Sequence, residues 1–307
     1  MTTEPAPPLE ISFDSGGEIC RAWHFPPQHD GMAKYLRIPC IVMGHGFGGT
    51  RDAGLPAYAQ RFSAAGLHVI IFDYRHFGGS DGEPRQLISI KKQLEDWRAA
   101  AAFARDMEGV DPSRVALWGS SFSGGHVVET AFHDRRVAAV IAQCPVLDGI
   151  SVLRAYMRYA GIASGVRLSI AALRDKYHSL IKHSPVMLPI VAPSGTLAFL
   201  SSADAEPGYR AITPAGWRNE TAARIALEMP FYRPIRHIYD LSCPQLLQFC
   251  NRDLIAPQPQ IDLTRQARGR RNIVVRTYDC GHFDLYQGQW FEQAIDGQIA
   301  FLQNVFA

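Results

Sequence analysis

The chain has 307 residues, of which 47% are hydrophobic and 20% are charged, and its formal net charge at pH 7 is +2. This composition is typical of a globular protein with a sizeable core, and the length indicates one large domain or a core domain with an insertion. No basic run is long or clustered enough for nucleic acid or an anionic membrane surface, so we expect neither as a partner.

The N-terminus and the cysteines bear on the compartment. Residues 1–8 lack the basic start and apolar run of a secretory signal. The most apolar stretch, residues 186–200, is interrupted by prolines and is too short to span a membrane. Six cysteines are scattered without a CxxC pair or metal-ligand spacing. We therefore expect reduced, buried thiols in a cytoplasmic protein, with no metal and no cofactor.

The N-terminal half reads as a hairpin followed by alternating strands and helices. Residues 9–13 and 19–25 alternate in polarity around Gly16 and Gly17, which predicts a β-hairpin. The next apolar runs predict strands at 39–43, 69–72, 115–118 and 137–142, with helices at 55–65, 88–107 and 127–132. Strands apolar on both faces predict an α/β fold, with a mostly parallel central sheet and helices on both faces.

The α/β rhythm stops near Asp148, and residues 150–232 contain helical pieces broken by five prolines. It resumes with predicted strands at 244–249 and 272–278 and helices at 258–268 and 289–305. We therefore divide the chain into an N-terminal part of the core (1–149), a helical lid insertion (150–232, "the insertion") and a C-terminal part of the core (233–307). In an open α/β sheet, ligands bind at the carboxyl ends of the strands, which the insertion is expected to cap.

A candidate nucleophile, Ser121, follows the strand 115–118 in the motif GSSFSGG. A serine on a tight strand-to-helix turn has an exposed hydroxyl, and its neighbours two positions away must be small. Gly119 meets this requirement, whereas Ser123 stands where glycine is usual. Two alternatives remain: a Ser/Gly-rich loop that only caps the helix, and Ser123 as the attacking serine.

A serine nucleophile needs a base, and the base needs an orienting carboxylate. Asp253 follows the strand 244–249 and His282 follows the strand 272–278, so both are expected at the same sheet edge as Ser121. The order serine, acid, histidine is that of this arrangement. Asp148 is the alternative carboxylate; Asp253 as a helix cap and His282 as a loop histidine are the structural alternatives.

Backbone N–H groups that could bind an oxyanion are expected in the glycine-rich loop at residues 44–49. This loop follows the strand 39–43, and we assign the N–H groups of Phe47 and Phe122 to the oxyanion hole. His45 is expected to bond the loop backbone. The loop lacks the Lys-Ser/Thr pair of a P-loop and does not satisfy GxGxxG, which argues against a nucleotide site.

Four large side chains of the insertion are candidate substrate-binding residues: Tyr156, Met157, Tyr159 and Trp217. We expect them to wall an apolar pocket for the acyl or alcohol part of the substrate. The alternative is that they form the insertion's own core.

The motifs HGFGG (45–49), FDYRHFGGSDGEPRQ (72–86), GSSFSGG (119–125), NRDLIAP (251–257) and CGHF (280–283) resemble the α/β-hydrolase superfamily. The likeness is to an esterase branch related to dienelactone-hydrolase-like and X-Pro-dipeptidyl-peptidase-like proteins, and it covers nearly the whole chain from Leu9. It implies an α/β-hydrolase fold in which Ser121 attacks, His282 is the base, Asp253 orients it, and Phe47 and Phe122 supply oxyanion N–H groups. Dienelactone hydrolases use cysteine, so the serine favours ordinary esters.

The expected function is a serine hydrolase that cleaves a small-molecule carboxylic ester or related acyl bond through an acyl-enzyme. Alternatives are a thioesterase, a lactonase or an acyltransferase of secondary metabolism, a small peptidase, and a non-catalytic binding protein of the same fold. A homodimer is one possible assembly.

Overall fold

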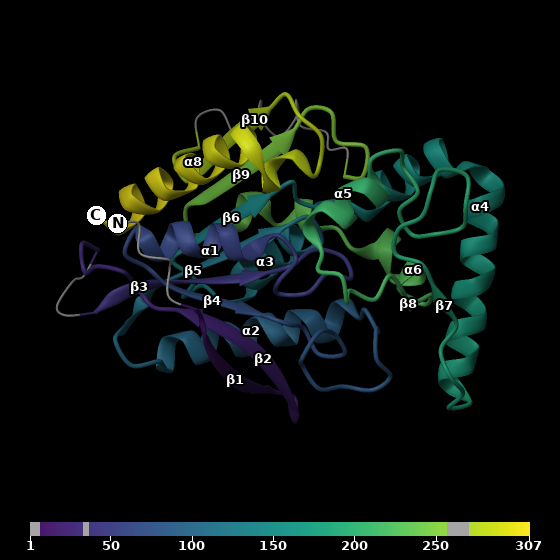
Figure 1. Ribbon diagram of the computed structural model, residues 1–307, viewed down its shortest axis with the longest axis horizontal. Coiled ribbons are helices and arrows are strands. Elements are labelled where there is room, and N and C mark those ends of the chain that lie inside the picture. Colours follow the sequence, from purple (N-terminus) through teal and green to yellow (C-terminus); the bar gives the residue numbers. More distant parts are fainter. Residues whose placement is uncertain (1–6, 33–36, 257–269) are drawn as a thin grey trace.

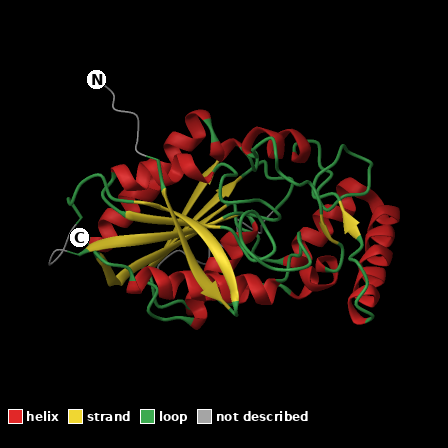
Figure 2. Ribbon diagram, turned by 60° about the horizontal axis from the view of Figure 1, so that its bottom comes forward, coloured by secondary structure: helices red, strands yellow, loops and turns green. Residues whose placement is uncertain are grey.

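An eight-stranded sheet runs through the centre of the protein, and helices cover both of its faces (Figures 1 and 2). The structure is a computed structural model that describes residues 7–32, 37–256 and 270–307. The strands lie in the order β1-β2-β4-β3-β5-β6-β9-β10. They comprise β1 (Leu9–Ser15), β2 (Glu18–Phe25), β3 (Ile38–Gly44), β4 (His68–Phe72), β5 (Val110–Ser120), β6 (Ala139–Gln143), β9 (Gln245–Cys250) and β10 (Ile273–Tyr278).

Strand pairing follows the predicted α/β pattern. β1 and β2 form the predicted antiparallel hairpin, in which Gly16 and Gly17 have φ of 64° and 83°, a conformation that favours glycine. β2 also pairs antiparallel with β4, and the remaining pairs from β4 to β10 are parallel. The expected mostly parallel sheet is therefore confirmed.

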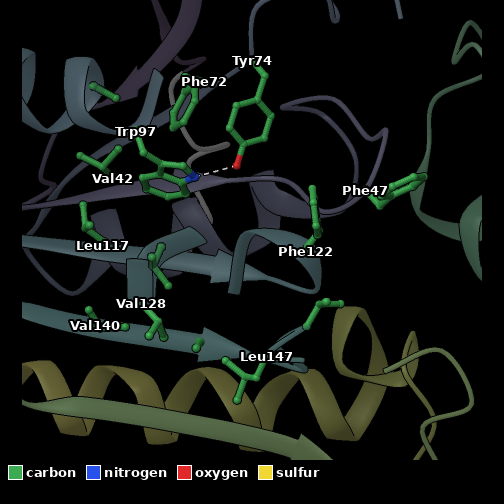
Figure 3. Close-up of a cluster of buried hydrophobic side chains, with 14 of the residues drawn as sticks. Val42, Phe47, Phe72, Tyr74, Trp97, Leu117, Phe122, Val128, Val140 and Leu147 are labelled. Atoms are coloured by element: carbon green, nitrogen blue, oxygen red, sulfur yellow. Dashed lines mark hydrogen bonds between the residues drawn. The ribbon is translucent and has the colours of Figure 1, made fainter. Parts of the chain in front are cut away.

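The two faces of the sheet are covered by different helices, because successive side chains of a strand point to opposite faces. Val42 and Leu117 pack with residues of α2 (Ile90–Asp106) and α3 (Phe122–His133). Ile41 and Trp118 pack with residues of α1 (Leu55–Ala64) and α8 (Gly288–Phe306). The first of these cores is shown in Figure 3.

Two predicted boundaries differ from the structure. β5 begins at Val110 rather than at 115, because the polar, proline-containing stretch before Val115 carries no strand pattern. α3 begins at Phe122 rather than at 127, because its first turn is rich in serine and glycine, which favour helices weakly. The predicted helix at 258–268 lies outside the described residues.

Between β6 and β9, which are neighbours in the sheet, the chain makes an excursion of helices and short strands. Its elements are α4 (Gly149–Leu180), β7 (Met187–Leu188), α5 (Ala205–Ile212), β8 (Thr221–Ala222), α6 (Ile225–Glu228) and the 3-10 helices Met229–Phe231, Pro234–Arg236 and Ile238–Asp240. In Figure 1, α4 lies at the opposite end of the molecule from the C-terminus. The exact limits of the insertion stay a prediction.

The long helix α4 has a buried and an exposed face. Leu168 and Ala172 face the protein, whereas the outer face exposes large apolar side chains: Ile162, Val166, Ile170, Leu173, Tyr177 and Leu180. Among the described residues, no helix has the length and hydropathy needed to cross a membrane.

Candidate active site

Ser121 occupies a strained turn between β5 and α3. Its φ and ψ are 57° and −117°, which a non-glycine residue rarely adopts and which costs about 1–3 kcal/mol. Hydrogen bonds hold the turn: Ser121 N–H donates to Gln143 O (2.8 Å), and Ser121 O accepts from Val146 N–H (2.8 Å). A Cβ at Gly119 would lie 2.1 Å from Ser123 O, so only glycine fits there. The turn therefore has the geometry of a nucleophile elbow.

The serine at position 123, where glycine is usual, has a structural explanation. Its buried hydroxyl donates to His45 O (2.5 Å) and contacts the hydroxyl of Tyr74. Tyr74 in turn accepts from Trp97 Nε1 at 2.7 Å, the bond drawn in Figure 3. Ser123 thus ties the elbow to the 44–49 loop, and its hydroxyl is already bonded to that backbone.

The structure brings Ser121, His282 and Asp253 together from three separate loops. His282 Nε2 lies 3.0 Å from Ser121 Oγ, and His282 Nδ1 lies 2.6 Å from Asp253 Oδ2. If Nδ1–H donates to the carboxylate, Nε2 is left to accept the serine proton. The three residues are only 7%, 2% and 8% exposed, respectively, so little water competes for these bonds.

Further contacts orient the carboxylate and the imidazole. Asp253 Oδ1 accepts from Ile255 N–H (2.9 Å) and Ala256 N–H (2.8 Å), which leaves Oδ2 for His282. Burial by itself lowers the pKa of His282, but the charge of Asp253 and its hydrogen bond outweigh burial, so the pKa lies above the ordinary value. Asp253 thus stabilises the imidazolium that forms when His282 accepts a proton.

The alternative carboxylate, Asp148, is engaged elsewhere. Its Oδ1 lies 2.6 Å from Arg233 Nε, and its Oδ2 accepts from Ser151 Oγ at 2.8 Å. The carboxylate that contacts His282 is therefore Asp253 and not Asp148.

The N–H groups assigned to the oxyanion hole belong to two peptide units whose carbonyl oxygens are bonded. Gly46 O accepts from His45 Nδ1 (3.0 Å) and Gly49 N–H (3.3 Å), and this orients the following N–H, that of Phe47. Ser121 O is bonded as described above, and this orients the N–H of Phe122. A trans peptide directs its N–H opposite to its C=O, so both N–H directions are set by these bonds.

His45 takes the structural position expected from the sequence. Burial lowers its pKa to about 4, so the ring is neutral at pH 7 and donates from Nδ1 to Gly46 O. Gly46 lies against the nucleophile: a Cβ there would be 3.0 Å from Ser121 Cβ.

Two residues of the insertion hold the same loop from outside. Tyr209 Oη donates to Phe47 O (2.6 Å), and Trp217 Nε1 donates to Gly48 O (2.8 Å). Their rings are stacked, with centroids 5.2 Å apart and planes at 23°. Tyr209 was not singled out from the sequence, because nothing in an irregular, proline-rich segment indicates where one hydroxyl points.

A cavity of about 80 Å³ adjoins Ser121. The core supplies Phe47, Phe122 and Val146 to its walls, and the insertion supplies Tyr156, Phe199 and Leu200. In Figure 3, Phe47 and Phe122 stand at the end of the hydrophobic core, and their ring centroids are 5.6 Å apart. The cavity is therefore an apolar space that opens onto the nucleophile.

The four candidate substrate-binding residues lie in different places. Tyr156 lines the cavity at Ser121. Met157 and Tyr159 are partly buried and pack against the main hydrophobic core, and the Tyr159 ring lies 5.5 Å from that of Tyr156. Trp217 contacts the 44–49 loop as described above.

A second space, of about 20 Å³, lies on the other side of the nucleophile. Ser121, His282, His45 and Tyr209 line it. A space of this size holds about one water molecule.

One group of metal-type donors occurs among the described residues: Cys144, Asp253 and His282 lie within 4.8 Å of one another. Asp253 and His282 already bond to each other and to Ser121, and Cys144 Sγ lies 3.1 Å from Cys250 Sγ. These donors form the Ser121 arrangement, and we assign no metal to them.

The fold and the Ser121 arrangement define the class of protein. The chain belongs to the alpha/beta hydrolase family, whose model matches residues 41–294. The resemblance inferred from the motifs is thereby confirmed, and the family places the protein among hydrolases.

Particular relatives narrow the comparison. The chain is 42% identical over 307 residues to the quorum-quenching protein AidA of Acinetobacter baumannii (strain MDR-ZJ06), covering 99% of this chain and 97% of that protein. It is 30% identical over 278 residues to the thiohydrolase aneE of Aspergillus aculeatus, covering 88% and 86%. The crystal structure of the alpha/beta hydrolase GrgF from Penicillium sp. sh18 superposes with a TM-score of 0.81 at 24% identity, covering 98% and 99% of the two chains; it shows the shared fold.

Proposed function

We propose that the protein is a serine hydrolase that cleaves a carboxylic ester or a related acyl bond through an acyl-enzyme on Ser121. The observation that carries this proposal is the pair of contacts at His282, 3.0 Å to Ser121 Oγ and 2.6 Å to Asp253 Oδ2. A hydroxyl, a base and an orienting carboxylate in hydrogen-bonding contact are what nucleophilic catalysis by serine requires.

In the first half-reaction, Ser121 Oγ bonds to the acyl carbon while His282 Nε2 takes the serine proton. The negative charge that develops on the acyl oxygen is held by the N–H groups of Phe47 and Phe122. The charge on the imidazolium is balanced by Asp253. His282 then gives its proton to the departing alcohol or thiol as the bond to the acyl carbon breaks, which leaves the acyl group on Ser121.

In the second half-reaction, water replaces the departed group. His282 takes a proton from the water as its oxygen bonds to the acyl carbon, and then returns a proton to Ser121 Oγ as the acid leaves. The water-sized space beside Ser121 and His282 supports water as the acyl acceptor.

We propose that the acyl part of the substrate occupies the apolar cavity at Ser121. The walls at Phe122, Phe199 and Leu200 favour a hydrocarbon chain, and burial of each methylene contributes about 0.8 kcal/mol. The similarity to a protein named as a thiohydrolase supports thioesters beside oxygen esters and lactones as candidate substrates.

Acyl transfer to an alcohol is the second candidate function. It is favoured by the similarity to the polyketide transferase grgF of Penicillium sp., 30% identical over 198 residues and covering 64% of this chain. The same acyl-enzyme serves both outcomes. Product analysis with and without an added alcohol distinguishes them: free acid alone supports hydrolysis, and a new ester supports transfer.

Labelling with a fluorophosphonate, together with turnover of p-nitrophenyl esters, tests the central proposal. We expect one covalent adduct on Ser121 of the native protein, and neither adduct nor turnover in Ser121→Ala. Circular dichroism of both proteins controls for folding. A folded native protein that forms no adduct and hydrolyses no ester overturns the proposal.

We also propose a homodimer formed through the outer face of α4. The support is the set of exposed side chains Val166, Ile170, Leu173, Tyr177 and Leu180, which recur at spacings of four and three residues, the pattern of a helix–helix seam. Light scattering is expected to give twice the chain mass for the native protein and the single mass for Ile170→Glu. A monomeric native protein rejects this assembly.

We further propose a cytoplasmic location. All six cysteines are buried, and Cys250 Sγ lies 3.1 Å from Cys144 Sγ and 3.5 Å from Cys280 Sγ, beyond the disulfide bond length of about 2.05 Å. Such clustered thiols without disulfide geometry are usual in reducing compartments. Recovery of the protein in the cytoplasmic fraction of its native cells is the expected result.

A further inference from the structure

The hydroxyl of Tyr156 is a buried polar group without a partner among the described residues. Tyr156 is 4% exposed, and its Oη has neither a hydrogen bond nor contact with solvent. A buried hydroxyl that lacks a partner is less favourable than the matching hydrogen of phenylalanine, so most buried hydroxyls are bonded. The position of Tyr156 therefore needs a reason beyond packing.

The surroundings of Tyr156 indicate that reason. Tyr156 lines the cavity that opens onto Ser121. Every other side chain on that lining is apolar except the Ser121 hydroxyl, which is bonded to His282. Tyr156 is therefore the one hydrogen-bonding side chain that this lining offers to a bound acyl chain in addition to the nucleophile.

The ring of Tyr156 is held in place from behind. Its centroid lies 5.5 Å from that of Tyr159, with the planes at 71°, so the two rings pack edge to face. Burial raises the pKa of Tyr156, so the hydroxyl stays protonated at neutral pH and can both donate and accept a hydrogen bond.

We propose that Tyr156 determines specificity by hydrogen-bonding an oxygen carried along the acyl chain of the substrate, so that the preferred acyl groups are hydroxy- or oxo-substituted rather than plain alkyl. This inference rests on the proposed function, because it places the acyl chain in the cavity at Ser121. A plain chain would bury the hydroxyl unpaired, whereas an oxygenated chain would satisfy it. Sites that hydrogen-bond a substrate oxygen discriminate against analogues without it for this reason.

The test compares acyl chains of equal length on one leaving group. The substrates are p-nitrophenyl octanoate and a series of octanoates that carry one hydroxyl or one oxo group at successive carbons beyond the one next to the carbonyl. For the native protein we expect at least one oxygenated chain to exceed plain octanoate in kcat/KM by about 10-fold, the effect of one hydrogen bond. Tyr156→Phe should lose this preference.

Tyr159→Phe is the matched control, because it removes the same atom three residues further along α4 from a ring that is not part of the cavity lining. It should keep the preference for the oxygenated chain. If Tyr159→Phe loses the preference as fully as Tyr156→Phe does, the hydrogen bond does not come from Tyr156 and the inference is overturned.

Thermal unfolding separates a ligand-binding hydroxyl from a structural one. Without ligand, Tyr156→Phe should melt at or above the temperature of the native protein, because it loses no hydrogen bond. Addition of the preferred oxygenated acid should raise the melting temperature of the native protein more than that of Tyr156→Phe. A clear fall in the melting temperature of ligand-free Tyr156→Phe would show a partner within the protein and overturn the inference.

The inference and the proposed function can fail separately. Ser121-dependent turnover with no preference for any oxygenated chain overturns the role of Tyr156 and leaves the hydrolase intact. Absence of Ser121-dependent turnover across the whole series overturns the proposed function and the inference with it.

Discussion

Tyr209 Oη donates a hydrogen bond to the carbonyl oxygen of Phe47 at 2.6 Å, and so links the insertion to the loop beside the nucleophile. Tyr209 is buried and stacks on Trp217, which donates to the next carbonyl of the same loop, that of Gly48. The backbone expected to bind the oxyanion is therefore held partly by residues that lie more than 150 positions further along the chain.

This link predicts a kinetic phenotype for Tyr209→Phe. The substitution keeps the ring that stacks on Trp217 and removes only the donor to Phe47 O. A looser loop binds the transition-state oxyanion less well than the ground state requires, so kcat should fall by about 10-fold while KM changes little. Steady-state kinetics on p-nitrophenyl esters measure both constants. A rise in KM at unchanged kcat would instead place Tyr209 in ground-state binding.

Asp253→Asn and Asp148→Asn should differ strongly. Asp253 contacts His282, whereas Asp148 contacts Arg233 and Ser151. By analogy with the serine-protease triad, loss of the orienting carboxylate should lower kcat about 10⁴-fold. Asp148→Asn should retain most of the activity per folded molecule, measured after chemical denaturation has established the folded fraction. The reverse result would mean that the acid has been assigned to the wrong residue.

The pH dependence of activity follows from the raised pKa of His282. Only the neutral imidazole can take the serine proton, so kcat/KM should rise with pH and reach half its plateau above 6.5, the ordinary histidine value. In Asp253→Asn the charge that raises the pKa is gone and burial, which lowers it, remains. The acid limb of this slower variant should therefore move to lower pH. A limb that stays in place would show that another group controls it.

Ser123→Ala tests the hydroxyl that replaces the usual glycine. The variant loses the bond to His45 O and leaves the Tyr74 hydroxyl without its acceptor. Its free energy of unfolding should fall by about 1–3 kcal/mol, as measured by urea titration with an unchanged m-value. Thr130→Ala on the same helix is the control, because Thr130 Oγ1 has no hydrogen-bond partner among the described residues. Equal losses in both variants would argue that the Ser123 bonds contribute little.

The sequence alone was sufficient for the strands, the helices and the order of Ser121, Asp253 and His282. Apolar runs such as those of β3 and β4 must be buried on both faces, and this requirement predicts a parallel sheet covered by helices without any knowledge of the contacts. Because the carboxyl ends of parallel strands meet at one edge, residues that follow β5, β9 and β10 were expected to be neighbours there. These are properties of spacing and polarity, which are local.

Only the tertiary structure decided how the insertion contributes to the site. Residues 150–232 have no simple period, so the chain does not reveal that Tyr156 lines the cavity, that Tyr159 packs behind it, or that Tyr209 and Trp217 bond the loop at Phe47. The choice of Asp253 over Asp148 also depended on which carboxylate the folded chain pairs with an arginine and which with a histidine. Side-chain directions in an irregular segment are set by long-range packing, and composition and spacing do not encode them separately.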